Sequence, residues 1–314
     1  MVASRTMLAA SFEDHELLNL EQALIDNDID FPLLVSPKID GIRFTVFKGE
    51  AQSRSGKRLP NTHFQSLFTD GQLDYLDGEV VVGLDPACTN TANGTLFNRT
   101  QSAIMSAGGT PVISLHVFDD ITDPNLTFAS RLAIASSRVR AYDSLGTIIR
   151  YVRHEPLHTP REVVKYEEEA LLTGYEGIML RSPNAPYKFG RSTLKQQGLI
   201  KVKRFIDDEA TVTGFIALER NTNPIVPNAF GLAKRSSHKA GKVPDNLLGK
   251  LVAEHRRYGE IVIGSGFDVA TREKIWFNQA EFLGKTVTFK YQPHGTGEKP
   301  RAPIFKGIRD ERDL

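Results

Sequence analysis

The pattern of regular structure changes near residue 204, and this change constrains the fold of the chain most strongly. Before it, strand-like and helical segments are interleaved; after it, short strand-like segments follow one another with one short helix among them. A chain of 314 residues is long enough for two domains, each with its own core. We therefore predict two domains, residues 1–204 and 205–314.

The first part of the chain predicts an α+β domain built on antiparallel sheets. Runs of β-branched and aromatic residues predict strands, and apolar residues spaced three or four apart predict helices. Thr159-Pro160 is a typical start for the last of these helices. The expected strands are 31–35, 44–47, 76–82, 112–118, 177–181 and 199–203, and the expected helices are 13–23, 128–140 and 161–172.

The second part predicts a small β-barrel. Short strands expected at 210–218, 248–254, 260–263 and 286–291, with one helix at 271–278, are typical of a Greek-key barrel such as an OB-fold. The first two of these strands are separated by a long polar segment, residues 221–246. A loop of this length in a compact domain is usually functional or disordered.

Composition and cysteine content exclude several classes of protein. The chain is 40% hydrophobic and 25% charged, which excludes collagen-like and intrinsically disordered proteins. No apolar stretch is long enough for a membrane span, and the first residues do not resemble a signal peptide. Cys88 is the single cysteine and cannot form an internal disulfide. We expect a monomeric cytoplasmic protein with no membrane partner.

Positive charge gathers in residues 181–204, which hold seven basic residues and no acidic one. Such a strip is a candidate phosphate-binding surface, although a solvated basic face is an equally good interpretation of charge alone. Its members are Arg181, Lys188, Arg191, Lys195, Lys201, Lys203 and Arg204.

The strongest local motif is Lys38-x-Asp40-Gly41-x-Arg43, which follows the first expected strand. A deprotonated lysine amine is a nucleophile, and a neighbouring cation such as Arg43 would lower its pKa. Asp40 would orient the amine or pair with Arg43, and Gly41 would let the backbone approach a bound phosphate. By itself the motif is equally compatible with a surface turn.

Four further motifs follow in order: Asp77-Gly78-Glu79, Phe118-Asp119, Glu176-Gly177-x-x-x-Arg181 and Lys201-x-Lys203. Each alone has an ordinary structural interpretation as a hairpin turn, a core residue or the solvent face of a strand. Their shared order and spacing match the motifs of covalent nucleotidyltransferases. With the C-terminal segments 234–238, 263–267 and 289–313, the chain resembles ATP-dependent DNA ligases of the short bacteriophage type over nearly its whole length.

The resemblance implies that Lys38 attacks the α-phosphate of ATP and carries AMP. It also implies that Glu79 binds the ribose, Phe118 stacks on adenine, and Lys201 and Lys203 contact the α-phosphate. Glu79 and Glu176 would bind Mg²⁺, which offsets the charge of the triphosphate. The implied nucleotide-binding residues are Asp40, Gly41, Arg43, Arg54, Glu79, Phe118, Glu176, Lys201, Lys203, Arg309 and Arg312.

The last motif of the family, R-x-D-K, aligns here with Arg309-Asp310-Glu311-Arg312. Glu and Arg replace Asp and Lys, so the signs of charge are kept while the side-chain geometry differs. In the family this motif orients pyrophosphate. Arg301 and Lys306 are alternative candidates for that role here.

The partner implied by the resemblance is nicked duplex DNA, bound mainly through its phosphates and without sequence preference. The long polar segment would wrap the duplex, and a hinge near residues 205–208 would let the domains rotate. The expected DNA-binding residues are Arg43, Arg54, Lys188, Arg191, Lys234, Arg235, Lys239 and Lys242.

Four alternatives are weaker. An mRNA capping enzyme usually has Asp-Gly where this chain has Glu176-Gly177, and RNA ligases commonly lack this kind of C-terminal barrel. One cysteine cannot supply the four-cysteine zinc site of NAD-dependent ligases. A non-catalytic nucleic-acid-binding barrel would leave the five ordered motifs unexplained.

Overall fold

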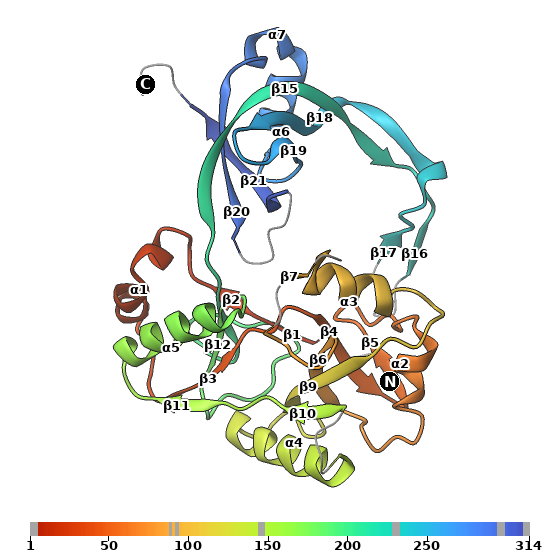
Figure 1. Ribbon diagram of the computed structural model, residues 1–314, viewed down its shortest axis with the longest axis vertical. Helices are drawn as coiled ribbons and strands as arrows, with labels where there is room; N and C mark the ends of the chain where they lie inside the picture. Colours follow the sequence, from red (N-terminus) through yellow and green to blue (C-terminus); the bar gives the residue numbers. More distant parts are fainter. Residues whose placement is uncertain are drawn as a thin grey trace. The chain divides into compact units, whose positions relative to one another are not determined.

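The computed structural model describes residues 6–87, 90–91, 94–143, 148–227, 233–293 and 299–309. The chain divides into two units, Met1–Lys203 and Arg204–Leu314 (Figure 1). The first unit contains β1 (Met7–Leu8), β2 (Ala10–Ser11), η1 (Glu16–Asn19), α1 (Leu20–Asp26), β3 (Leu33–Pro37), β4 (Ile42–Phe47), β5 (Glu50–Gln52), α2 (Thr62–Ser66), β6 (Leu76–Val82), β7 (Asn90–Thr91), β8 (Gly94–Thr95), α3 (Leu96–Ile104), β9 (Ile113–Asp120), α4 (Phe128–Tyr142), β10 (Ile149–Tyr151), β11 (Glu155–Leu157), α5 (Pro160–Thr173), β12 (Ile178–Arg181), β13 (Gly190–Arg191) and β14 (Ile200–Val202).

Two five-stranded sheets dominate the first unit, with strand orders β10-β9-β6-β4-β5 and β11-β3-β12-β14-β2. Most neighbouring strands are antiparallel, as expected, but the edge pairs β10–β9 and β14–β2 are parallel. One buried apolar cluster includes Phe44, Phe64 and Val80, and a second includes Leu24, Val35 and Ile178. The α+β fold class is thus confirmed.

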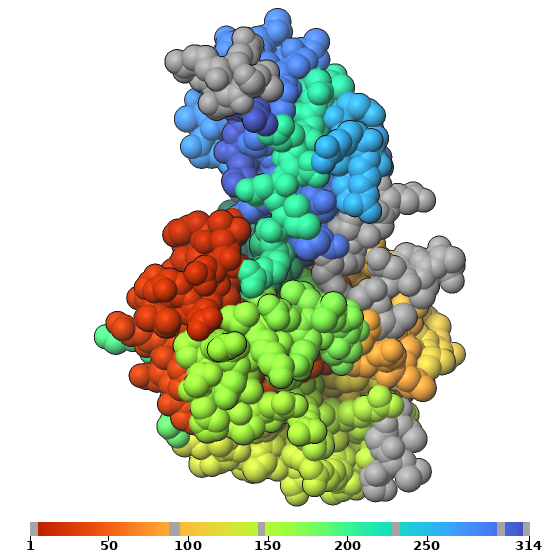
Figure 2. Space-filling model, turned by 60° about the vertical axis from the view of Figure 1, so that its left-hand side comes forward, coloured from red at the N-terminus to blue at the C-terminus, as the bar shows by residue number. Residues whose placement is uncertain are grey.

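The best local signal in the sequence, the start of α5, is confirmed in detail. Glu162 N–H donates to Thr159 Oγ1 at 3.2 Å, while the Glu162 carboxylate accepts from Thr159 N–H, so the two residues form a capping box behind Pro160. Gly174 ends the helix with φ of 101°. α5 packs against α1, and Figure 2 shows the two next to each other in green and red.

Two connections cross from one sheet of the first unit to the other. Residues 38–41 lead from β3 to β4, and residues 152–154 lead from β10 to β11; in each case the two strands belong to different sheets. Both connections are irregular segments that lie where the two sheets meet. This topology is what brings the Lys38 motif to the boundary between the sheets.

The second unit is the expected OB-fold barrel. Its sheet has the order β19-β18-β15-β20-β21, and a bridge between Ser265 and Ile304 joins the two edges. Val212, Leu251 and Phe289 lie in its buried core. Its elements are β15 (Ile206–Asn221), β16 (Ile225–Pro227), β17 (Ala233–Arg235), η2 (Lys239–Gly241), β18 (Lys242–His255), β19 (Gly259–Ile263), α6 (Val269–Phe277), α7 (Gln279–Phe282), β20 (Thr286–Gln292) and β21 (Arg301–Ile308).

The second unit differs from expectation in two respects, its long polar segment and its last strand. Much of the polar segment 221–246 is regular structure, because β15 and β18 extend into it and β16 pairs with β17. Residues 206–208, near the expected hinge, pair with β20 and form the first residues of a barrel strand. The final strand β21 has no predicted counterpart, because its lysine and glycine interrupt the apolar alternation. In the part of the chain that the structure describes, no helix is both long and apolar enough to span a membrane.

Candidate active site

The backbone of the Lys38 turn is tied to the Glu176 motif. Lys38 N–H donates to Gly177 O at 2.8 Å, and Glu176 N–H donates to Lys38 O at 3.2 Å. Gly177 permits this arrangement, because a Cβ there would lie 2.2 Å from Val202 O. The Lys38 motif and the Glu176 motif, which are distant in the sequence, are therefore joined by backbone hydrogen bonds.

The side chain of Glu176 lies between two lysine ammonium groups. Lys38 Nζ is paired with Oε2 of this carboxylate, and Lys203 Nζ is paired with Oε1. The Glu176 side chain is 2% exposed, so the pairs are shielded from water and salt. The structure thus brings three of the predicted residues into one ion-paired cluster.

The expected activation of Lys38 by Arg43 was wrong for this arrangement. Burial lowers the pKa of Lys38, but the carboxylates of Glu176 and Glu79 outweigh burial and the net shift is upward. The pKa of the neighbouring Lys201 is lowered, through burial and the nearby charge of Lys38. Lys38 is therefore held protonated, and its amine becomes nucleophilic only once the Glu176 pair is broken.

Arg43 pairs with Asp77 and not with Asp40. Arg43 Nη1 also donates to Met7 O at 2.5 Å, and its guanidinium carbon lies 5.3 Å from the ring centroid of Phe118. The hydroxyl of Tyr187 donates to Asp77 Oδ2 at 2.7 Å and accepts from Met7 N–H at 2.9 Å. Sequence reasoning missed this network: Asp77 stands in a motif but received no role, and Tyr187 has no local signal.

Glycine is required at position 41 for packing, whereas we expected it to let the backbone approach a phosphate. A Cβ at this position would lie 2.3 Å from Val80 O and 2.8 Å from Val81 Cγ1, both in β6. The glycine lets the turn pack directly on the neighbouring strand. Asp40 beside it is buried, and its charge helps to raise the pKa of Lys38.

Eight of the predicted residues line one pocket of about 660 Å³ in the first unit, a size suited to a nucleotide. The pocket combines cations with a carboxylate and an aromatic ring, the groups expected to meet phosphates, ribose and base. Burial raises the pKa of Glu79 in this pocket to about 7. The eight residues are Lys38, Arg43, Arg54, Glu79, Phe118, Arg191, Lys201 and Lys203.

Arg181 is not part of an exposed basic strip, contrary to our expectation. It is 2% exposed, and its Nη2 donates to Asp119 Oδ2 at 2.5 Å. Arg131 approaches the same carboxylate, with Nε at 2.8 Å from Asp119 Oδ1. The buried group joins β12, β9 and α4. Asp119 stands in a sequence motif but received no role, and Arg131 was missed because its partner is remote in the chain.

The carboxylates fit Mg²⁺ only as part of a site shared with ATP. No group of three or more His, Cys, Asp or Glu side chains suited to a metal ion occurs among the described residues. Mg²⁺ is usually bound by one or two carboxylates together with substrate phosphates. Glu79 and Glu176 supply that donor chemistry, because each influences the pKa of Lys38 and so lies near its amine.

The remaining predicted residues lie elsewhere. Lys188 donates to Gln196 Oε1 at 2.8 Å outside the pocket lining, and Arg309 is ion-paired with Glu209. Arg312 lies outside the described residues. The other predicted DNA-binding residues belong to the second unit: Lys234 and Arg235 in β17, Lys239 in η2, and Lys242 at the start of β18.

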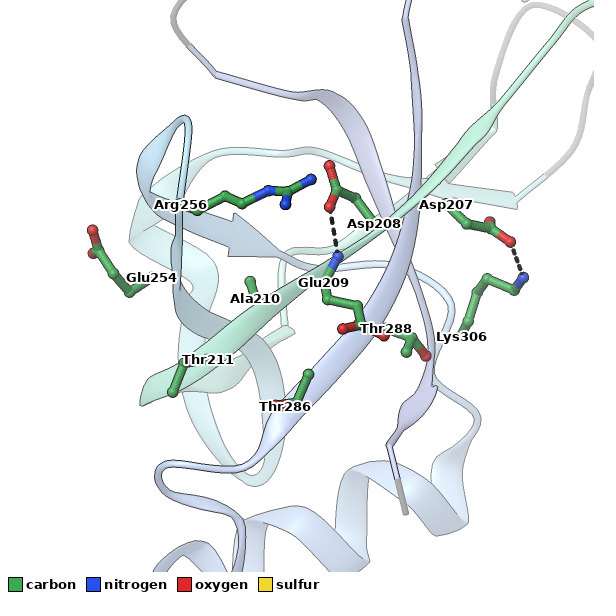
Figure 3. Close-up of a pocket in the computed structure, with 10 residues that line it drawn as sticks. All are labelled: Asp207, Asp208, Glu209, Ala210, Thr211, Glu254, Arg256, Thr286, Thr288 and Lys306. Atoms are coloured by element: carbon green, nitrogen blue, oxygen red, sulfur yellow. Dashed lines mark hydrogen bonds and ion pairs between the residues drawn. The ribbon is translucent and has the colours of Figure 1, made fainter. Parts of the chain in front are cut away.

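A second hollow, of about 700 Å³, lies on the barrel of the second unit (Figure 3). Four carboxylates and two cations line it, and one of the cations, Lys306, pairs with Asp207 Oδ2 at 2.5 Å. Carboxylates outnumber cations in this hollow, so it would repel a phosphate. The lysine-centred pocket is therefore the better nucleotide site.

An α+β unit with a lysine-centred pocket, followed by an OB-fold barrel, defines the architecture of an adenylation domain joined to an OB domain. The family model "ATP dependent DNA ligase domain" matches residues 6–203, and "DNA ligase OB-like domain" matches residues 241–309. The chain belongs to the ATP-dependent DNA ligase family, as its sequence motifs predicted.

Similar proteins agree with this assignment. A DNA ligase of Haemophilus influenzae is 24% identical over 305 residues, which cover 96% of this chain and 97% of that protein. The solved Chlorella virus DNA ligase-adenylate is 30% identical, with a TM-score of 0.52 over 98% of this chain and 99% of that chain. A Lig E DNA ligase, described as binding DNA with a minimal scaffold, is 25% identical, with a TM-score of 0.66 over 97% and 98%.

Proposed function

We propose that this chain seals nicks between a 5′-phosphate and a 3′-hydroxyl in duplex DNA, using ATP and Mg²⁺. Lys38 Nζ attacks the α-phosphorus of ATP, so that an N–P bond forms while the α–β P–O bond breaks and pyrophosphate leaves. An oxygen of the DNA 5′-phosphate then takes the AMP and frees Lys38. Finally the 3′-hydroxyl attacks the 5′-phosphate, forms the phosphodiester and expels AMP.

The observation that carries this proposal is the position of Lys38 in a pocket lined by other cations. Lys201, Lys203 and Arg54 line the same pocket of about 660 Å³. Phosphoryl transfer depends chiefly on positioning and on neutralising charge. A triphosphate in this pocket would meet the attacking amine and its charge-neutralising groups together.

The other pocket residues support distinct tasks. Phe118 offers a ring on which adenine can stack, and the carboxylate of Glu79 can accept hydrogen bonds from ribose hydroxyls. Glu79 and Glu176 would hold Mg²⁺, which supplies positive charge against the phosphates. Arg43 and Arg54 line the same pocket and can hold phosphates of AMP or of the nick.

Lys38 must lose its proton and its contact with Glu176 before it attacks. The Glu176 carboxylate is shared with Lys203. Arrival of the α-phosphate gives Lys203 a new anionic partner and weakens the cluster. The pair with Glu176 therefore favours the protonated, unreactive form of Lys38.

DNA binding would involve both units of a monomer. In the first unit, Arg191 lines the pocket, and Lys188 lies in the same basic stretch. In the second, the hairpin β16–β17 and the turn that follows carry Lys234, Arg235 and Lys239, with Lys242 beyond them. Arg309 would orient pyrophosphate only after leaving Glu209. Phage origin, a cytoplasmic setting and a place in replication, repair or recombination belong to the same proposal.

The test is sealing of a 5′-phosphorylated nick in duplex DNA with ATP and Mg²⁺, together with transfer of label from [α-³²P]ATP to the protein. Lys38→Ala should abolish both. The control Lys165→Ala removes an exposed lysine of α5, 77% exposed in its side chain, and should change neither. Sealing that persists in Lys38→Ala, or wild type that carries label from GTP but not from ATP, would refute the proposal.

A further inference from the structure

His154 is a wall residue of the nucleotide pocket that the proposed reaction does not use. It lies in the connection from β10 to β11, where the chain crosses between the two sheets. Phe118, Val152 and Met179 line the same pocket. The imidazole of His154 and the ring of Phe118 therefore line the same pocket.

One nitrogen of this imidazole, Nδ1, already forms a hydrogen bond. Nδ1 lies 2.9 Å from Val152 O. A carbonyl oxygen only accepts hydrogen bonds, so Nδ1 carries the proton and Nε2 carries the lone pair of the neutral ring. Within the described ranges, Nε2 has no hydrogen-bond partner. The ring also packs edge-on against Phe128, with centroids 5.2 Å apart, which limits its rotation.

The neutral form is the stable one in this setting. Burial lowers the pKa of His154 to about 4, and the nearby cation of Arg181 acts in the same direction. Exchange of the proton between the two nitrogens is also unfavourable, because it would place the Nδ1 lone pair against Val152 O. Nε2 thus remains an acceptor at neutral pH.

We propose that His154 is a specificity-determining residue, whose Nε2 accepts a hydrogen bond from the exocyclic amine of the adenine in ATP. Adenine presents a donor at N6, whereas guanine presents the acceptor O6 at the corresponding place. O6 would face the Nε2 lone pair and leave both acceptors unsatisfied. The residue therefore selects ATP against GTP, and this inference rests on the proposed function.

The test compares rates of Lys38 labelling with ATP, with purine riboside triphosphate, which lacks the amine, and with GTP. For the wild type, removing the amine should slow labelling by roughly tenfold, and GTP should be used still less. His154→Ala should use ATP and the purine analogue at rates within roughly twofold of each other. The matched control His158→Ala changes an exposed histidine and should keep the wild-type preference.

The preference between two nucleotides is a ratio measured on one protein, so partial loss of folded protein does not change it. Equal use of ATP and the purine analogue by the wild type would overturn the inference without any variant. An unchanged preference in His154→Ala would overturn it as well. If ATP labels nothing while the protein is folded, the proposed function fails, and the assignment of His154 fails with it.

Discussion

Arg43 and Asp77 form a bidentate ion pair, with Arg43 Nε 2.8 Å from Asp77 Oδ1 and Nη2 2.5 Å from Oδ2. The Asp77 side chain is fully buried and that of Arg43 is 16% exposed. The pair joins β4, which directly follows the Lys38 turn, to β6, which carries Glu79. It therefore fixes the guanidinium within the pocket that Lys38 also lines.

Asp77→Asn should destabilise the protein by about 3–5 kcal/mol, because it leaves a largely buried guanidinium without its charged partner. Lys38 labelling should fall by at least roughly tenfold, since Arg43 loses its fixed position. Urea unfolding and labelling with [α-³²P]ATP measure the two effects. Tyr187→Phe removes a neutral hydroxyl that donates to Asp77 and accepts from Met7 N–H, and it should cost about 1–3 kcal/mol. Equal losses in the two variants would mean that charge pairing is not what holds Arg43.

Glu176→Gln should lower the pKa of Lys38, because Glu176 is the strongest of the carboxylates that raise it. The pH dependence of acetic anhydride modification at Lys38, followed by peptide mass spectrometry, reports this pKa without requiring ligase activity. Lys203→Met keeps the Lys38–Glu176 pair and serves as the comparison, so it should not shift the modification curve to lower pH. A curve for Glu176→Gln that coincides with the wild-type curve would contradict the assigned role of the pair.

The stability of the first unit should fall between pH 6.5 and pH 4. Burial lowers the pKa of His116 from 6.5 to about 4, so the unfolded chain binds a proton that the folded chain excludes in this range. The loss for one such histidine reaches up to about 3 kcal/mol at the acidic end. His116→Gln should flatten the decline, measured by urea unfolding at pH 7 and pH 4.5, whereas His158→Gln should not. A decline that is identical in all three proteins would show that His116 does not cause it.

Nick binding should weaken steeply with salt, and the hairpin of the second unit should account for part of the slope. Lys234→Ala combined with Lys239→Ala should reduce the slope of log affinity against log salt by about 0.9 for each DNA phosphate that these lysines neutralise. Lys38 labelling should be unchanged, because these lysines lie outside the nucleotide pocket. Fluorescence anisotropy with nicked DNA at several salt concentrations measures the slope, with Lys165→Ala as the control. An unchanged slope with lower labelling would give the hairpin a structural role.

Features encoded by neighbouring residues were predictable from the sequence. The limits of β6 were predicted as residues 76–82, and α5 begins at the capping box of Thr159 and Glu162. The alternation of a strand and the cap of a helix are local, so a few adjacent residues determine them. The order of the motifs likewise indicated the ligase family before any contact was known. The same local rules missed β21, whose residues lack a regular alternation.

The chemistry of the pocket was decided by pairs that are far apart in the chain. Lys38 and Glu176 are 138 positions apart, and Arg43 and Asp77 are 34 apart. No local pattern predicts which carboxylate takes which cation, and for this reason Arg43 was expected beside Lys38 and Arg181 on the surface. The sequence by itself determined the family, and it predicted the candidate site residues and a two-part organisation. Only the tertiary structure decided their partners and protonation, because burial and opposite charge act through space and not along the chain.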